Sequence, residues 1–368
     1  MLLLPLTASE PIKAVGTSIF NMLNALCPLF VLPKTWNMTL AGDIMLCSIS
    51  PVKNPFSAVA RITSASDVFI ANLEIPLTKA TEPTKRKTPE QVKAKRQFIL
   101  KADPLHIRHL VQAGLDAVSL GNNHTMDYGL KGLTEQIGLL AQNRIAFGGA
   151  GLNLAEASAP AVFQAGESPR IGMVSYLAFM GAKNRWVNTP ATAKSAGVAV
   201  PPFGSVIDRK AQAKIRQIVD AAKSRSGFVI VALHGGIERQ TVPTAYQVLL
   251  GRAFIDAGAD LVVGHHPHVL QGAEIYRGKP ILYSTGNLVN CLPGTTALFH
   301  LRYEGNRLLK AALTPCSISR GAVSPMKAFL AKQTRASFDR LSKLIQQKYP
   351  HRLARPLLSA YRSETAIL

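Results

Sequence analysis

Polar residues with catalytic or metal-binding side chains follow the apolar segments of this 368-residue chain. Five of the nine histidines come directly after such segments, in the stretches SLGNNH, FVIVALH and LVVGHHPH. Asp43 closes LAGD and Glu74 closes ANLE in the same way. In α/β sheets, ligands bind beyond the carboxyl ends of the strands. We therefore expect these side chains to converge on one site.

Metal binding is the chemistry that this set of residues favours. His266 and His268 are two residues apart, so an extended backbone would direct both imidazoles to the same face. With His234, Asp43 and Asn123 they form a mixed nitrogen and oxygen set that lacks a thiolate. Such a set suits Zn, Mn or Fe(II) better than Ca or Mg. Taken singly, Asp43 also suits a turn and His234 a buried core position, so the prediction of one or two divalent ions depends on the joint pattern.

The elements that must position these residues alternate between short apolar runs and amphipathic segments, which predicts an α/β fold. We expect strands at residues 38–46, 67–72, 116–120, 145–147, 171–176, 228–233, 261–264, 269–276, 279–284 and 297–303. We expect helices at residues 104–113, 129–142, 208–224 and 244–257. Each predicted site residue then lies at or just beyond the end of a strand.

Several of these segments together carry a family resemblance. They are LAGDIML, IANLEIPLT, VSLGNNHTMDYG, VALHGGIE and GADLVVGHHPHVLQGAEIYRGKPILYSTGN, in this order between Met38 and Asn290. The ensemble resembles the CapA family of poly-γ-glutamate capsule biosynthesis proteins, within the calcineurin-like metallophosphoesterase superfamily. The resemblance implies a four-layer α/β/β/α metallophosphoesterase-like sandwich, with metal ligands on loops at one end of its two sheets.

The resemblance also implies a role for each site residue. The implied metal ligands are Asp43, Glu74, Asn123, His234, His266 and His268. His124 would donate a proton to the leaving group, with Asp127 or Glu238 orienting it. We place Glu238, His265 and Asn287 on the substrate side of the site. Glu238 also suits the first turn of a helix, and Asn287 also suits a turn.

The chain departs from the superfamily pattern in the first two blocks. Met45 occupies the position of the histidine in the usual Asp-x-His block. The second block is Asn-x-Glu, ending at Glu74, in place of Gly-Asp. We therefore expect the first of two metal subsites to be weakened or built differently from that of a two-metal phosphatase.

Net charge and composition limit the classes of partner that this chain is expected to bind. Lys and Arg number 42 and Asp and Glu 21, which gives a formal charge of +21 and favours anionic partners. Nucleic acid ranks last among them, because no nucleic-acid motif accompanies the charge and aromatic residues make up only 7%. The basic segment 79–96 is predicted to be an exposed loop. Within it, the run from Lys85 to Arg96 is either merely solvated or, if the loop borders the histidine cluster, a lid that grips a polyanion.

Three regions are predicted along the chain. Residues 37–315 form the CapA-like domain, and residues 316–368 form a basic, mostly helical C-terminal extension. Residues 1–36 are an apolar lead-in or a membrane anchor, because Ala14–Pro33 carries no charge over a length that would cross a bilayer. Asn21, Asn24 and Pro28 count against the anchor. A membrane-associated or exported location is favoured, with the cytoplasm as the alternative.

Two functions from different classes follow. The first is a metal-dependent hydrolase that acts on a γ-glutamyl or phosphoester bond during synthesis of an anionic polymer. The second is a non-catalytic, membrane-associated accessory protein that binds the polymer or its synthase. Met45 favours the second, whereas the intact Asn123-His124 and His266-x-His268 pairs favour the first.

Overall fold

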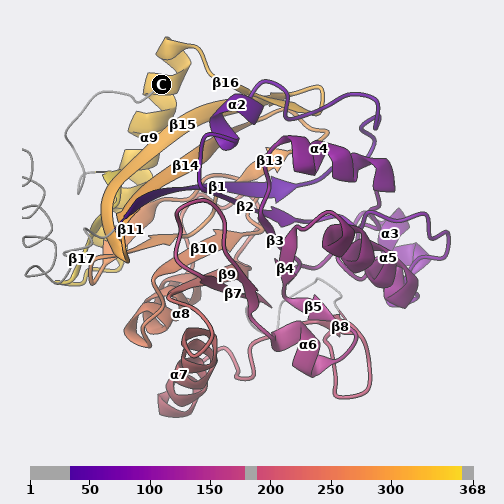
Figure 1. Ribbon diagram of the computed structural model, residues 1–368, viewed down its shortest axis with the longest axis horizontal. Helices are drawn as coiled ribbons and strands as arrows, with labels where there is room; N and C mark the ends of the chain where they lie inside the picture. The colour runs from indigo at the N-terminus through magenta and orange to yellow at the C-terminus, as the bar shows by residue number, and fades with distance from the viewer. Residues whose placement is uncertain (1–33, 179–188, 359–368) are drawn as a thin grey trace, which may run out of the picture. The chain divides into compact units, whose positions relative to one another are not determined.

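Two β-sheets packed face to face form the centre of the computed structural model, which describes residues 34–178 and 189–358 (Figure 1). The first sheet has the strand order β16-β15-β14-β1-β2-β3-β4, with β13 paired to β1. The second has the order β17-β11-β12-β10-β9-β7-β6, and a small third sheet pairs β5 with β8. Both large sheets are mixed. The parallel strands of the first sheet, β1 to β4, form one half of it and reach its edge at β4. Those of the second sheet, β12, β10, β9 and β7, lie at its centre.

The strands have the following bounds. Those of the first sheet are β1 (Thr35–Ile44), β2 (Val68–Leu73), β3 (Ala117–Ser119), β4 (Ala146–Gly148), β13 (Asn287–Val289), β14 (Gly294–Glu304), β15 (Arg307–Ser319) and β16 (Ala322–Pro325). Those of the second are β6 (Ala161–Phe163), β7 (Ile171–Leu177), β9 (Phe228–His234), β10 (Leu261–His265), β11 (Ala273–Tyr276), β12 (Lys279–Leu282) and β17 (Ala354–Pro356). The small sheet consists of β5 (Ala150–Gly151) and β8 (Gly197–Val198).

Helices cover the outer faces of the two sheets (Figure 1). The first sheet packs against α2 (Ala60–Thr63), α4 (Ile107–Gln112) and α5 (Gly129–Gln142), and the second against α7 (Arg209–Lys223) and α8 (Ala245–Asp256). The shorter helices are α3 (Pro89–Lys93), η1 (Pro104–His106) and α6 (Leu154–Ser158). The predicted four-layer α/β/β/α sandwich is therefore confirmed.

Three apolar layers explain why these segments fold as they do. The layer between the sheets contains Trp36, which stacks on Tyr303 at 4.8 Å and meets Phe228 edge-on at 5.1 Å. All seven residues of β9 are buried, as expected for a central parallel strand with both faces covered. On α7, Ile215 and Val219 are spaced by one turn, so they face the sheet together.

The C-terminal segment extends both the first sheet and the core. The boundary predicted at residue 315 falls inside β15, and β16 follows directly. Helix α9 (Ala328–Lys348) then buries Phe338 in the layer between the sheets and Ile345 beside α8. From Thr35 onward, the described residues belong to one compact unit.

The amino-terminal prediction falls almost entirely outside the described residues, since the description begins at residue 34. Thr35 and Trp36, which we assigned to the lead-in, belong to β1. Among residues 34–178 and 189–358, no helix is both long and apolar enough to cross a bilayer.

Two glycines allow the close backbone contacts that bring the strand ends together. A Cβ atom at Gly42 would lie 2.0 Å from the carbonyl oxygen of Gly286, and one at Gly264 would lie 2.1 Å from that of Tyr283. Any side chain at these two positions would force the neighbouring strands apart. Because Asp43 and His265 are the next residues along the chain, these glycines also set the positions of the two site residues.

Candidate metal centre

Parallel strands from both sheets bring the predicted residues together. Asp43 lies near the end of β1, in register with Asn72 of β2, and Glu74 follows β2 directly. In the second sheet, His234 ends β9 and is in register with His265, the last residue of β10. The carboxyl ends of parallel strands from the two sheets meet here, so the strand-end residues converge as we expected.

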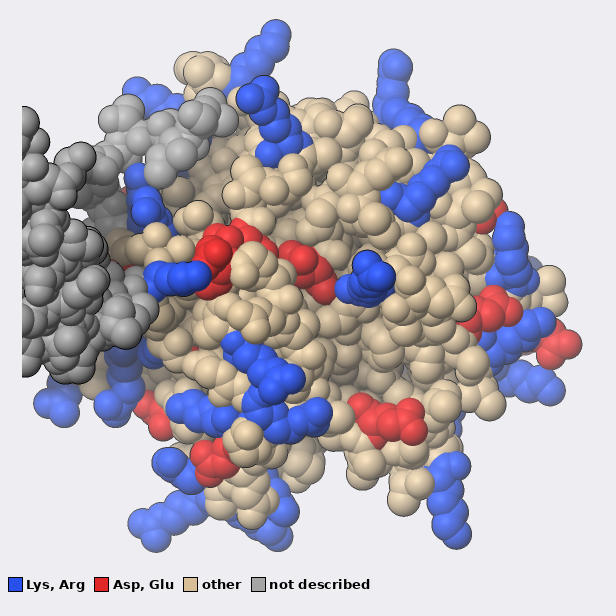
Figure 2. All heavy atoms as spheres, in the orientation of Figure 1, with Lys and Arg blue, Asp and Glu red and all other residues tan. Residues whose placement is uncertain are grey.

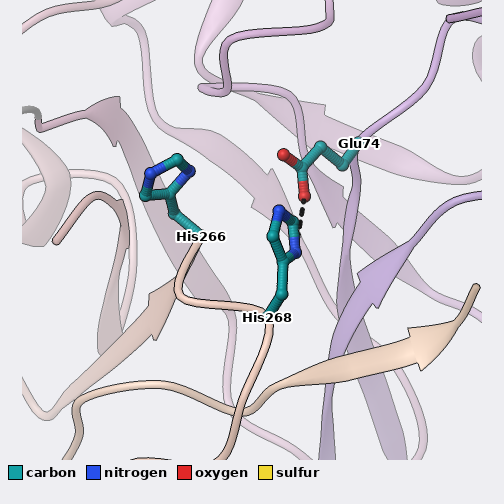
Figure 3. Close-up of side chains that lie close together, drawn as sticks. All are labelled: Glu74, His266 and His268. Atoms are coloured by element: carbon teal, nitrogen blue, oxygen red, sulfur yellow. Dashed lines mark ion pairs between the residues drawn. The ribbon is translucent and has the colours of Figure 1, made fainter. Parts of the chain in front are cut away.

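Glu74 is at the centre of the cluster. Its Oε1 lies 3.3 Å from Nε2 of His234, and its Oε2 lies 3.8 Å from Nδ1 of His268. Figure 3 shows the Glu74 carboxylate directed at His268, with the ring of His266 alongside. Two sets of three residues place one ligand atom each within 4.8 Å of one another, and Glu74 belongs to both. They are Glu74, His266 and His268, and Asp43, Glu74 and His234.

The residues fit a divalent cation. Both carboxylate oxygens of Glu74 are buried and have no hydrogen-bond partner among the described residues. A buried carboxylate in such surroundings is costly unless it is paired or coordinates a metal. Oδ1 of Asn123 lies 2.8 Å from Nε2 of His234 and adds an amide oxygen to the same group. Imidazole nitrogens with carboxylate and amide oxygens are the ligands expected for Zn, Mn or Fe(II).

A chain of hydrogen bonds orients Asp43. Nδ2 of Asn72 donates to Oδ1 of Asp43 at 2.8 Å, and Nδ2 of Asn122 donates to Oδ1 of Asn72 at 3.1 Å. Nδ1 of His265 lies 3.3 Å from Oδ1 of Asp43 and 3.2 Å from the hydroxyl of Thr285. His265 is only 1% exposed. Its position beneath Asp43 supports an orienting role and not the substrate contact that we expected from the sequence.

The other two residues that we placed on the substrate side both lie beside His268. Oδ1 of Asn287, the first residue of β13, is 2.9 Å from Nδ1 of His268. Oε1 of Glu238 is 3.9 Å from Nε2 of the same ring. Glu238 belongs to a turn before α8, so it does not begin a helix. His268, Glu238 and Asn287 are partly exposed, in contrast to the buried Asp43, Glu74 and His234.

The turn that carries His266 and His268 differs from the extended backbone that we assumed. His266 has a φ of 97° and His268 a φ of 57°. The two rings still lie 5.8 Å apart between centroids, but a turn with left-handed residues brings them together, and alternation along a strand does not. Residues other than glycine adopt such angles at a cost, and they do so most often at functional sites.

Met45, which replaces a histidine of the superfamily pattern, is half-buried and contacts neighbours outside the histidine cluster. Its Sδ accepts a hydrogen bond of 3.3 Å from Nδ2 of Asn290. The position that would complete an Asp-x-His pair is therefore occupied by a thioether next to a loop amide.

His124 and Asp127 form a buried pair next to the metal ligands. Nδ1 of His124 lies 2.8 Å from Oδ2 of Asp127, so of the two residues that we expected to orient His124, Asp127 is hydrogen-bonded to its ring. Burial lowers the pKa of His124, although the charge of Asp127 opposes this effect. The imidazole is therefore neutral at pH 7. Because Asp127 accepts the proton on Nδ1, the atom left to exchange a proton is Nε2.

Lys87 binds the other oxygen of Asp127, although nothing in the basic run of the sequence distinguishes this lysine from its neighbours. Its ammonium is buried and lies 2.5 Å from Oδ1 of Asp127. It also donates to the carbonyl oxygens of Asn123, at 3.1 Å, and Phe98, at 2.9 Å. The only local signal was the capping box that begins α3 at Thr88, because it fixes the backbone directly after Lys87.

Burial and mutual charge strongly shift the pKa values of Asp43, Glu74 and His268. Burial alone would raise the pKa of Asp43, but hydrogen bonds with His265 and His268 hold it well below its usual range. Burial and then the charge of Asp43 raise the pKa of Glu74 well above its usual range. Burial alone would lower the pKa of His268, but the charges of Glu74 and Asp43 raise it to about 10. The three groups therefore keep at least one proton at neutral pH.

The other two ring ligands are held neutral. Burial, followed by the charge of His268, lowers the pKa of His266 to about 3. Burial, followed by the charge of His266, lowers the pKa of His234 well below its usual value. Neutral imidazole is the form that binds metal, so these two histidines need no deprotonation before a cation binds.

Comparison with known proteins identifies the family of this chain. The model of the family described as bacterial capsule synthesis protein PGA_cap matches residues 37–291. The chain belongs to this family. The matched region contains every predicted site residue and agrees with the extent that we expected, Met38 to Asn290, so the CapA resemblance is confirmed.

Individual members and neighbours give further context. The chain is 29% identical over 288 residues to the PGA biosynthesis protein CapA of Bacillus subtilis, covering 76% of this chain and 68% of that protein. It is 29% identical over 254 residues to a probable polyglutamine synthesis accessory protein of Mycobacterium tuberculosis, covering 69% and 63%. A phosphatase structure from Mycoplasma pneumoniae aligns with a TM-score of 0.49 at 13% identity, covering 81% and 96%.

The buried ion pair generates a stability prediction. Replacing Lys87 by Met leaves the Asp127 carboxylate charged and buried, so the free energy of unfolding should fall by about 3 kcal/mol. Lys79 is the matched control because its ion pair with Asp103 is exposed, and Lys79→Met should cost less than about 1 kcal/mol. Urea unfolding followed by circular dichroism measures both. Equal effects of the two substitutions would contradict a structural role for Lys87.

The retained proton generates a pH prediction. A cation that binds beside Asp43, Glu74 and His268 must displace a proton that His268 keeps up to about pH 10. Metal affinity should therefore rise with pH, by up to about tenfold per unit between about pH 6 and 8 for one displaced proton. Calorimetric titration of the chelator-treated protein in buffers of different ionisation enthalpy measures the protons released. An affinity that does not change with pH would contradict this description of the cluster.

Proposed function

We propose that this protein is a metal-dependent hydrolase that cleaves a γ-glutamyl or phosphoester bond in an anionic polymer during capsule polymer synthesis. The observation that carries the proposal is the position of a neutral, oriented His124 directly beside a buried set of metal-type ligands. A binding protein needs neither a proton-exchanging group nor a buried carboxylate that lacks hydrogen bonds. The name of the Bacillus subtilis relative supports the polymer class.

The residues divide the chemical work between them. One or two divalent ions would be held by Asp43, Glu74, Asn123, His234, His266 and His268, and would supply Lewis acidity to polarise the scissile bond. Nε2 of His124 first accepts a proton from the attacking water, because the resting ring is neutral. The same atom then donates this proton to the leaving atom. Asp127 keeps the proton on Nδ1 and fixes the ring throughout.

Access and burial fit this division. His234 and His266 are almost fully buried, whereas His268 and Glu238 are partly exposed, so we place the approach of the substrate on the side of His268 and Glu238. A buried site strengthens electrostatic interactions with the reacting groups. The Glu238 carboxylate lies on the approach side, where it can hold a positively charged or hydrogen-bonding group of the substrate.

The alternative is a non-catalytic, membrane-associated accessory protein that binds the polymer or its synthase. Met45 supports it, since a ligand position of the superfamily is filled by a thioether. The name of the Mycobacterium tuberculosis relative, a probable polyglutamine synthesis accessory protein, supports it as well.

Turnover distinguishes the two functions. The protein loaded with Mn, Zn or Fe(II) should hydrolyse γ-glutamyl oligomers or phosphoesters. His124→Ala should lower kcat by about 10²- to 10⁴-fold, because it removes the proton exchange and leaves the ligands in place. His351→Ala is the matched control, since this histidine packs on Tyr276 near β17. Metal analysis should show the same content in all three proteins.

Two results would count against the hydrolase. One is a metal-loaded wild type that turns over neither substrate class, which would favour the accessory function. The other is a His124→Ala variant as active as the His351→Ala control, which would remove His124 from the mechanism.

A further inference from the structure

The segment of residues 79–101, here named the basic loop, contains eight Lys and Arg residues but only two Glu. It runs from the end of an isolated bridge at Leu77 to its partner at Ala102 and includes the short helix α3. Figure 2 shows Lys and Arg over much of the visible face, so charge alone does not distinguish this segment. Its attachment to the candidate metal centre does.

Hydrogen bonds anchor the basic loop to the turn that carries His124. The amide of Thr84 donates to the carbonyl oxygen of Asp127 at 2.8 Å, and the amide of Leu100 donates to Oδ2 of Asp127 at 2.7 Å. Between them, Lys87 binds the carboxylate of Asp127 and the carbonyl oxygen of Asn123. Asp127 therefore holds the loop at three points and orients His124 at the same time. The loop borders the histidine cluster, which is the condition that we set for a role beyond solvation.

Five cations of the loop project into solvent without an ion pair to any residue that the structure describes. They are Lys85, Arg86, Lys93, Lys95 and Arg96. In contrast, Lys79 pairs with Asp103, and Lys101 donates to the carbonyl of Ala80 and lies over the ring of Tyr128. Arg86 also lines a small hollow together with Asn123 and Asp127. Exposed cations without an ion-pair partner among the described residues therefore extend from Arg86, beside the predicted ligand Asn123, along the loop to Arg96.

We propose that the basic loop is a binding rim for a carboxylate-rich polyanion and holds the polymer chain against the metal centre. The proposal rests on the proposed function for the identity of the polymer, poly-γ-glutamate. Each unit of that polymer carries one carboxylate, so an extended chain can meet successive cations of the rim. Exposed ion pairs are individually weak and are screened by salt. Binding therefore depends on several cations together and weakens as ionic strength rises.

The test replaces Lys85, Arg86, Lys93, Lys95 and Arg96 by Gln and leaves Lys87 intact. Helix α7 offers a matched control of three Lys and two Arg, all exposed, on the outer face of the second sheet. The control positions are Arg209, Lys210, Lys214, Arg216 and Lys223. The measurement is the affinity of each full-length protein for fluorescently labelled poly-γ-glutamate at near-physiological and at high salt. Melting temperature and metal content verify that each variant is folded and intact at the site.

The rim predicts a specific pattern. The loop variant should bind about tenfold more weakly than wild type, whereas the α7 variant should stay within about twofold. Equal weakening of both variants would show that the net charge of +21 binds the polymer non-specifically and would overturn the proposal. Absence of polymer binding by the wild type would overturn it too.

A short substrate separates this proposal from the proposed function. A γ-glutamyl dipeptide is too short to span the rim, so its hydrolysis tests the metal centre alone. Hydrolysis of the dipeptide combined with unchanged polymer affinity in the loop variant would overturn the rim and leave the hydrolase standing. Polymer binding that depends on the loop, without hydrolysis of the dipeptide or of a phosphoester, would support the rim and contradict the hydrolase.

Discussion

Two carboxylates shielded from water, Asp43 and Glu74, impose the constraint on which the rest of the site depends. Both are fully buried where the ends of the two sheets meet, and their negative charges lie close together. Such a pair is stable only if positive charge or hydrogen-bond donors surround it. Asn72 and His265 supply part of this compensation to Asp43, and His268 supplies more to both. A divalent cation bound among the same atoms would supply the remainder.

Asp127 imposes a similar constraint one step further from the cluster. Its carboxylate is buried and accepts from Lys87, His124 and the amide of Leu100. One residue thereby fixes the tautomer of His124 and the path of the segment 79–101. The orientation of His124 and the position of the basic loop therefore both depend on Asp127. Nothing in that connection needs a large conformational change, because each contact is already made in the structure.

Helices and strands with a strong hydrophobic pattern were predicted well from the sequence, because burial of their apolar residues determines where they form. Helix α5 has the predicted bounds, Gly129–Gln142, and β9 differs from its prediction by one residue. The strand-end residues could be predicted for the same reason, since parallel strands deliver their carboxyl ends to one edge. The role of each site residue was then predicted from the family resemblance.

Features that depend on contacts between distant segments were not predictable. Lys87 looks like any other residue of a basic run until the fold buries it against Asp127. The turn at His266 has a backbone angle that spacing cannot reveal. Cys47 and Cys291 are 244 residues apart, yet their sulfur atoms lie 3.9 Å apart at the ends of the paired strands β1 and β13. The C-terminal helix looked like an appendage because its few buried residues, such as Phe338, are scattered among lysines and arginines.

The central claim is that Glu74 and its neighbours hold a metal ion, and elemental analysis tests it most directly. Glu74 is the decisive residue because both candidate ligand sets include it. We predict one or two equivalents of Mn, Zn or Fe in the purified wild type, loss of the metal in Glu74→Gln, and retention in the exposed control Glu82→Gln. A wild type that contains no metal, even after reconstitution with each of the three ions, would contradict it.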